Sequence, residues 1–247
     1  MSPVRLNLLR GFELVVDGVV VDIPSSAQRV VAYLALQPRP QLRTSVASSL
    51  WIDLTDERAG ANLRSALWKL RDLRDQVITA RANHLSLGAD VNVDVTAVVR
   101  DARDLLDDDT AHSELDLRGH DLHLLSADLL PEWDEDWILF ERERIRQLRV
   151  HAIEALSRRL SRAGRHVDAI EAGLCAVAAD PLRESAQRVL IEAHVAEGNL
   201  ADARRQYVTF GRVLWEALGI VPSAALGRLV GISDSERGAI DQREQLR

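Results

Sequence analysis

The amino-acid sequence predicts a mainly α-helical protein with small antiparallel β elements, divided into a mixed N-terminal part and an all-α second part. Three observations predict this fold class. β-branched residues alternate around an Asp-Gly pair near the N-terminus, apolar residues recur at helical spacing up to residue 74, and a 34-residue period runs through the second half. The 247 residues are enough for one or two domains.

The first predicted element is a β-hairpin within residues 4–23. Two apolar runs, LNLLRGFELVV and VVVDI, flank the pair Asp17-Gly18. An Asp-Gly pair between such runs is a strong short-range signal for a hairpin turn. We therefore expect antiparallel strands on either side of it.

Two helices are predicted next. The first begins at Ser25 or Ser26 and ends before Pro38. The second, SVASSLWI, is expected to be capped by the hydroxyl of Thr44 or Ser45, because these side chains accept hydrogen bonds from the free N–H groups of a helix start.

A third helix is expected over about residues 58–74, after the charged turn DLTDE. Its apolar stripe, with spacings of three and four, consists of Leu63, Ala66, Leu67, Leu70 and Leu73. The segment VITARANHLSLG then predicts two short strands around a turn at Ala82-Asn83. A sheet, three helices and a terminal hairpin in this order predict a winged helix-turn-helix.

The polar face of the third helix is the candidate DNA-reading surface. In a helix-turn-helix, the second of the paired helices enters the major groove, where its polar side chains meet the base edges. The planar fork of arginine suits phosphate or guanine, Asn62 can pair with adenine, and small residues allow a close approach. The candidate residues on this helix are Arg58, Ala61, Asn62, Arg64, Ser65, Trp68, Lys69 and Arg71.

Two further elements are expected to support DNA binding. The helix start near Thr44 and Ser45 presents free backbone N–H groups, which suit a phosphate. Arg81, at the tip of the second hairpin, is placed to reach a neighbouring minor groove. Two interpretations of Trp68 stay open, namely contact with sugar or base and packing against the hairpin or the second domain.

Charge is divided unevenly along the chain, whose net charge is −7. Residues 1–100 carry a net +2 and residues 101–247 a net −9. The segment 58–71 contains four basic residues and no acidic one. This asymmetry favours a polyanionic partner for the first part only, whereas a solvated helix face is the competing interpretation of the basic run.

The second half has the period of tetratricopeptide repeats. Gly164 and Gly198 lie 34 residues apart, as do Ala169 and Ala203, and Pro181 follows Gly164 by 17 residues. Small residues suit the close crossing of antiparallel helices, and proline ends the second helix. Two repeats are too few to stand alone, so flanking helices are expected to cap the stack.

The concave surface of such repeats suits a peptide, a small molecule or another protomer as partner. The residues that we expect to line it are Arg204, Arg205, Tyr207 and Arg212. A solvated helix face is the competing interpretation of the same residues.

Several functional classes lack their motifs. The single cysteine, Cys175, excludes an internal disulfide and a Cys-rich zinc site, and we expect it to be a small core residue. Neither a P-loop nor a Gly-x-Ser-x-Gly elbow occurs, and His120 with His123 is a weak metal candidate, so no metal or cofactor is expected. Without a long apolar run or a signal peptide, we expect a cytoplasmic protein with no membrane contact.

Clustered carboxylates are the one feature that favours an enzyme, because hydrolases use carboxylate pairs. They are Asp134, Glu135, Asp136, Glu141 and Glu143. Since arginines are interleaved with them, we assign all five to the polar face of an amphipathic helix with ion pairs at spacings of three and four. The chain is therefore not expected to be an enzyme.

Both parts resemble a known family of bacterial regulators. Residues 1–95 are similar to the OmpR-type winged helix of SARP-type antibiotic regulatory proteins, through LLRGFELVVDG, Leu50-Trp51 and ANLRSALWKLRDL. The second part resembles the bacterial transcriptional activator domain (BTAD), through LLPEWDEDWILFERERIRQL, RAGRHVDAIEAGLCAVAADPLRESAQRVLIEAHVAEGN and LGIVPSAALGRL. The expected domains are a winged helix (1–95), a TPR-like activator domain (96–232) and a flexible tail (233–247).

This resemblance implies a sequence-specific DNA-binding transcriptional regulator, usually an activator of a secondary-metabolite gene cluster such as antibiotic biosynthesis. Members bind promoter direct repeats as side-by-side protomers and contact RNA polymerase. By position, the family's recognition helix carries Arg58, Asn62, Arg64, Ser65, Trp68 and Lys69. The alternative is a TPR-like interaction adaptor whose winged helix no longer binds DNA, which the modest net charge of residues 1–100 favours.

Overall fold

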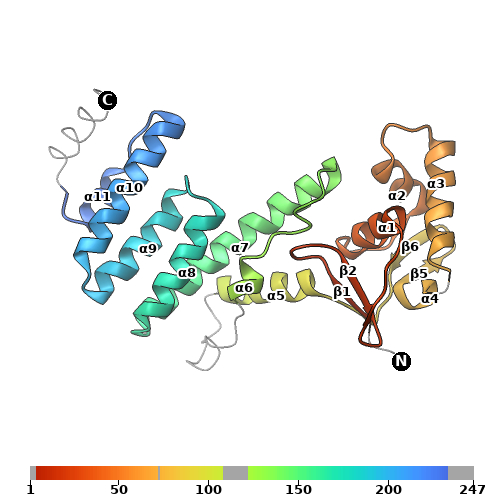
Figure 1. Cartoon of the computed structure of the whole chain (residues 1–247), viewed down its shortest axis with the longest axis horizontal. Helices are drawn as coiled ribbons and strands as arrows, with labels where there is room; N and C mark the ends of the chain where they lie inside the picture. The colour runs from red at the N-terminus through yellow and green to blue at the C-terminus, as the bar shows by residue number, and fades with distance from the viewer. Residues whose placement is uncertain (1–3, 72, 108–121, 233–247) are drawn as a thin grey trace. The chain divides into compact units, whose positions relative to one another are not determined.

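The computed structural model describes residues 4–71, 73–107 and 122–232 (Figure 1). These residues are mainly helical, with small sheets in the N-terminal part, so the predicted fold class is confirmed. Two compact units are present: an N-terminal unit of Met1–Val99 with Ala127–Ile145, and a C-terminal unit of Arg100–Ser126 with Arg146–Arg247. The expected domain boundaries stay a prediction, and the expected tail lies outside the described residues.

The N-terminal unit begins with a four-stranded sheet in the order β3-β2-β1-β7. Its strands are β1 (Val4–Asn7), β2 (Glu13–Val16), β3 (Val19–Val20) and β7 (Val91–Val93). β1 pairs antiparallel with β2 and parallel with β7, so one pairing departs from the predicted antiparallel pattern. The parallel pairing is possible because the chain between β1 and β7 is long enough to form a crossover.

The hairpin at Asp17-Gly18 is confirmed between β2 and β3. Both turn residues have positive φ, 53° and 81°, as a two-residue type I′ turn requires. The run LNLLRGFELVV does not form one strand. Arg10 and Gly11, with φ of 70° and 156°, turn the chain between β1 and β2, which then pair with each other.

Helices and a second small sheet complete the winged-helix part. The helices are α1 (Ser25–Ala35), α2 (Arg43–Leu50), α3 (Asp56–Lys69) and α4 (Arg74–Val77). The second sheet has the order β4-β6-β5, with β4 (Gln41–Leu42), β5 (Ile78–Arg81) and β6 (His84–Leu87). The β5-β6 hairpin turns at Ala82-Asn83, as predicted.

The start of α2 differs from the prediction. The N-cap residue is Leu42, without a side-chain hydrogen bond, so the predicted cap by Thr44 or Ser45 was wrong. The cause is tertiary, because Leu42 pairs with β6 and the Arg43 N–H donates to the Asn83 carbonyl at 2.8 Å. The chain therefore enters α2 directly from β4.

Helix α3 also has different ends from those predicted. It begins at Asp56, where acidic residues in the first turn complement the positive end of the helix dipole. It ends at Lys69 and not at Arg74, because the chain turns and resumes as α4, whose Val77 accepts a hydrogen bond from the Gly88 N–H beyond the hairpin. The buried side of α3 consists of Ala59, Leu63, Ala66 and Leu67, and Leu70 directly after the helix is buried with them.

Residues 127–145 join the N-terminal unit at the end of β1. Leu129 forms an isolated antiparallel bridge with Leu9, and the Leu130 N–H donates to the Leu8 carbonyl at 2.9 Å. The carboxylate of Asp94, the first residue of α5 (Asp94–Leu106), accepts the backbone N–H groups of Leu8 and Leu9. The backbone contacts of Leu129 and Leu130 thus attach residues 127–145 to the residues that follow β1, and the Asp94 carboxylate attaches the start of α5 to the same residues.

The described residues of the C-terminal unit are mainly helical. Its helices are the part of α5 from Arg100 onward, α6 (Leu122–Leu125), the part of α7 (Asp136–Arg162) from Arg146 onward, α8 (His166–Ala179), α9 (Glu184–Glu197), α10 (Leu200–Leu218) and α11 (Ala224–Leu229). Helix α9 packs against α8, α10 and α11. The predicted repeat positions have the expected roles: Gly164 and Gly198 end helices with φ of 74° and 89°, and Ala169 and Ala203 are fully buried. The α8–α9 crossing is close, since a Cβ on Gly173 would lie 3.0 Å from the Leu190 Cα.

Residues 4–71, 73–107 and 122–232 contain neither a membrane-spanning helix nor a metal-binding cluster. No helix there has the length and apolar character that crossing a bilayer requires. Nor do three or more His, Cys, Asp or Glu side chains within these ranges come together in a way that would hold a metal ion. The weak metal candidate paired His123 with His120, and His120 lies outside the described residues.

Candidate nucleic-acid interface

Helix α3 presents the predicted polar face to solvent. Its buried stripe packs against α1 and α2, and the opposite side is exposed at Ala61, Arg64, Ser65 and Trp68. The flanking residues Arg58, Lys69 and Arg71 are exposed as well, whereas Asn62 is half-buried. The structure thus brings the eight candidates together on and beside one helix face, and their contact with DNA stays a prediction.

Two contacts hold the C-terminal end of this face. The Arg71 guanidinium carbon lies 4.9 Å from the centre of the Trp68 ring, a cation–π arrangement, and Trp68 remains 64% exposed. The Lys69 ammonium donates to the Ser26 hydroxyl at 3.1 Å. Trp68 is mostly exposed, and both interpretations of it, contact with sugar or base and packing against the hairpin or the second domain, stay predictions.

The start of α2 is a second candidate contact point. Thr44 and Ser45 are exposed in its first turn, although neither caps the helix. Arg43, which the sequence interpretation omitted, lies beside them and is joined to the hairpin through its own backbone N–H. The signal that would have found it is its position next to the Thr-Ser pair.

The β5-β6 hairpin presents Arg81 at its tip. Arg81 is the last residue of β5 and is exposed, and Ala82 after it takes a positive φ of 48°. The wing therefore places a guanidinium where the sequence predicted one, and its role in a minor groove stays a prediction.

The candidate partner-binding residues on α10 do not share one surface. Arg204, Arg205 and Arg212 are exposed, whereas Tyr207 is 4% exposed. Tyr207 packs in a core cluster with Phe210, Leu214 and residues of α9 and α11, so its assignment to a binding surface was wrong. Arg205 pairs with Asp202 and Arg204 donates to the Val230 carbonyl at 2.9 Å.

The clustered carboxylates do not all lie on one helix. Asp134 and Glu135 precede α7, so their assignment to a helix face was wrong. Glu141 does form the expected ion pair with Arg144, at 2.7 Å. Glu135 instead accepts hydrogen bonds from Arg29 on α1 and from the Trp137 indole N–H, at 2.9 and 2.6 Å. These contacts give Glu135 a structural role.

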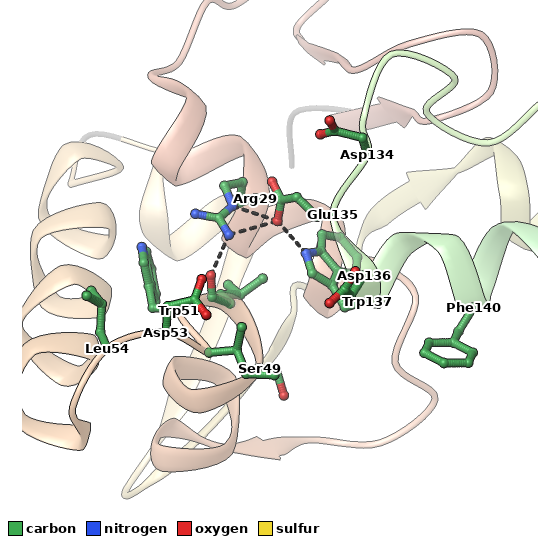
Figure 2. A pocket seen from close by; sticks show the side chains of 12 residues that line it. Arg29, Ser49, Trp51, Asp53, Leu54, Asp134, Glu135, Asp136, Trp137 and Phe140 are labelled. Carbon is green, nitrogen blue, oxygen red and sulfur yellow. Dashed lines mark hydrogen bonds and ion pairs between the residues drawn. The ribbon is translucent and has the colours of Figure 1, made fainter.

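A cavity of about 700 Å³ lies beside the Arg29–Glu135 pair (Figure 2). All the residues that line it belong to the N-terminal unit. Arg29 donates to the Leu50 carbonyl at the end of α2 and stacks on the Trp51 ring, 5.4 Å from its centre. Figure 2 shows Arg29 between Trp51 and the Glu135–Trp137 pair. No local sequence pattern indicates this arrangement, because its parts are far apart along the chain.

Cys175 is half-buried on α8 and not a full core residue as expected. Burial, and secondly the nearby Glu171 carboxylate, raises the pKa of its thiol. A raised pKa leaves the thiol protonated and weakly nucleophilic at neutral pH.

Comparisons with known proteins agree with this architecture. The family profile described as bacterial transcriptional activator domain matches residues 89–231. The chain therefore belongs to the bacterial transcriptional activator domain family and is a transcriptional regulator of the SARP type.

The fold is also similar to that of a solved structure. The structure of Mycobacterium tuberculosis EmbR in complex with a low-affinity phosphopeptide is similar, with a TM-score of 0.73 and 18% sequence identity. The comparison covers 99% of this chain and 70% of that chain, and it shows a shared fold. No curated protein matches the chain significantly in sequence.

Proposed function

We propose that this regulator is a sequence-specific DNA-binding activator whose helix α3 enters the major groove. The observation that carries the proposal is the exposure of Arg64, Ser65 and Ala61 on a helix that a buried stripe holds in place. The Arg64 fork suits a guanine edge, Asn62 suits adenine, and the two small residues permit close approach.

Phosphate contacts supplement this readout in the proposal. Arg58, Lys69 and Arg71 flank the face, and the exposed residues Thr44 and Ser45 lie in the first turn of α2, where helix N–H groups suit a phosphate. Arg81 on the wing reaches the adjacent minor groove. Trp68 adds a contact to sugar or base.

The proposed partners follow from membership of the SARP type. Protomers bind side by side on promoter direct repeats in the cytoplasm, contact RNA polymerase and activate a secondary-metabolite gene cluster. The helical repeats handle protein contacts or oligomerisation, with Arg204, Arg205 and Arg212 as the exposed candidates on α10. No cofactor is needed for any of these steps.

A protein-interaction adaptor is the second candidate function. The observation that favours it is the net charge of only +2 over residues 1–100, because DNA-binding modules usually have a stronger positive footprint. In that case the helical repeats would bind partners and the winged helix would not bind DNA.

Recovery of genomic fragments by the full chain, followed by gel-shift titration, tests the proposal. Arg64→Ala should abolish specific retardation because the bidentate base contact is lost. Arg5→Ala on β1 is the matched control, since it removes the same charge from an exposed site on another element. A salt series should give a slope of about −0.9 per phosphate contact. Unchanged binding by Arg64→Ala contradicts the recognition-helix assignment, and no recovered DNA favours the adaptor.

A further inference from the structure

We propose that the cavity between the α2–α3 turn and the start of α7 is a docking groove for a cationic protein segment with apolar side chains. The groove is lined by Trp51, Ile52 and Leu54 from the turn and by Trp137 and Phe140 from α7. None of these residues belongs to the candidate DNA-reading face, so the inference does not depend on DNA binding.

Several large apolar side chains that line the groove are exposed to solvent. Phe140 is 81% exposed, Ile52 72% and Leu54 38%. Single exposed apolar residues are ordinary, but a group of them lining one cavity marks an interaction site, because covering them removes apolar surface from water. The volume of about 700 Å³ is in the range of a ligand pocket and accommodates one or two side chains of a partner.

The charge of the groove selects a cationic occupant. Asp53, Asp134 and Asp136 are exposed around it, and none forms an ion pair within the described part of the chain. Among the described residues that line it, Arg29 is the one basic group, and Glu135 neutralises it at 2.8 Å. Three carboxylates without counter-charges repel nucleic-acid phosphates and attract Arg or Lys side chains. A basic, apolar protein segment satisfies both features of the groove.

The floor of the groove is held in place before any partner binds. Arg29 is bonded to Glu135 and to the Leu50 carbonyl, and the Trp137 indole N–H donates to the same Glu135 carboxylate at 2.6 Å. A preorganised site loses little conformational entropy on binding. Figure 2 shows the bonds from Arg29 and from Trp137 meeting at the Glu135 carboxylate.

Selection from a random 12-residue peptide display library on the full chain tests the proposal. The Ile52→Ser/Phe140→Ser variant serves for counter-selection. Because both side chains are exposed, we expect this variant to keep the native fold, and circular dichroism checks this. We expect enriched peptides to combine two or more large apolar residues with an excess of Arg and Lys. The most enriched peptide, made synthetically with a fluorescent label, is then titrated by anisotropy.

The affinities of the variants decide the outcome. Ile52→Ser/Phe140→Ser should weaken binding of the peptide at least about tenfold. Asp134→Asn/Asp136→Asn should weaken it about threefold to tenfold at low salt and less at high salt. Leu174→Ser, an exposed aliphatic site on α8, and Asp22→Asn, an exposed carboxylate elsewhere in the N-terminal unit, are the matched controls and should change nothing.

Four results would overturn the proposal. The first two concern the selection: no peptide is enriched, or the enriched peptides are acidic or wholly polar. The third is peptide binding that survives both groove variants. The fourth is a concentration-dependent dimer that Phe140→Ser abolishes, which would assign the groove to a second copy of the chain. DNA binding is measured on the same groove variants, because a failure of the proposed docking groove and a failure of the proposed DNA-binding function then give different results.

Discussion

The guanidinium of Arg29 and the carboxylate of Glu135 lie 2.8 Å apart, and this ion pair joins α1 to the residue that precedes α7. The two residues are 106 positions apart in the sequence. Both side chains are about one-quarter exposed, and Arg29 also bonds to the Leu50 carbonyl. The pair therefore connects residues 127–145 to the helices of the winged-helix part.

Arg29→Ala should lower the free energy of unfolding of the N-terminal unit by about 1.5–3 kcal/mol, as expected for losing partly buried hydrogen bonds to a charged group. Urea unfolding followed by tryptophan fluorescence measures this, since Trp51 and Trp137 contact the pair. Arg100→Ala is the control, because the Arg100–Asp101 pair is largely exposed and should contribute about 0–0.5 kcal/mol. An equal decrease in the free energy of unfolding for the two variants would show that Arg29 does not hold residues 127–145 in place.

Ser65→Leu should abolish DNA binding without changing the thermal midpoint. Ser65 is exposed on α3, so the added side chain costs no packing energy in the free protein but prevents close approach to base edges. Gel shift and differential scanning calorimetry measure the two effects. Ala178→Leu, also at an exposed helix position, is the steric control. Retained DNA affinity in Ser65→Leu would place the interface elsewhere.

Gly173→Ala should destabilise the C-terminal unit by about 1–3 kcal/mol. Its Cβ would lie 3.0 Å from the Leu190 Cα, so the backbones of α8 and α9 would have to separate. The control is Gly60→Ala on α3, where the nearest atom is the end of the flexible Arg64 side chain at 3.5 Å. That change should stabilise the protein by about 0.5–1 kcal/mol, because alanine is the better helix former. Thermal unfolding compares the two, and a stabilising Gly173→Ala would contradict the close crossing.

The Cys175 thiol should react slowly with a disulfide reagent at pH 8. Burial and Glu171 raise its pKa in the folded protein, so the pH at which the reaction rate is half-maximal should be higher than in the urea-unfolded chain. Because the unfolded thiol ionises first, stability should fall as pH rises through the ordinary thiol pKa. Glu171→Gln should raise the reaction rate, and Glu197→Gln, at an exposed position on α9, should not. Equal rates in folded and unfolded protein would contradict this.

Much of the fold was predictable because its signals are local. The Asp17-Gly18 turn, the buried stripe of α3 and the 34-residue spacing of Gly164 and Gly198 each depend on residues close in the chain or on a regular period. The exposed face of α3 followed from the same periodicity. The cap of α2 was mispredicted because pairing of Leu42 with β6, a distant strand, decides where that helix starts.

The sequence by itself determined which segments become helices or hairpins and which side of α3 faces solvent, since turn chemistry and apolar period operate over a few residues. Only the tertiary structure decided that Tyr207 is buried, that α3 stops at Lys69, and that Arg29, Trp51 and Glu135 meet around an acidic groove. These outcomes depend on contacts between residues far apart in the chain, and such contacts leave no periodic pattern from which they can be read.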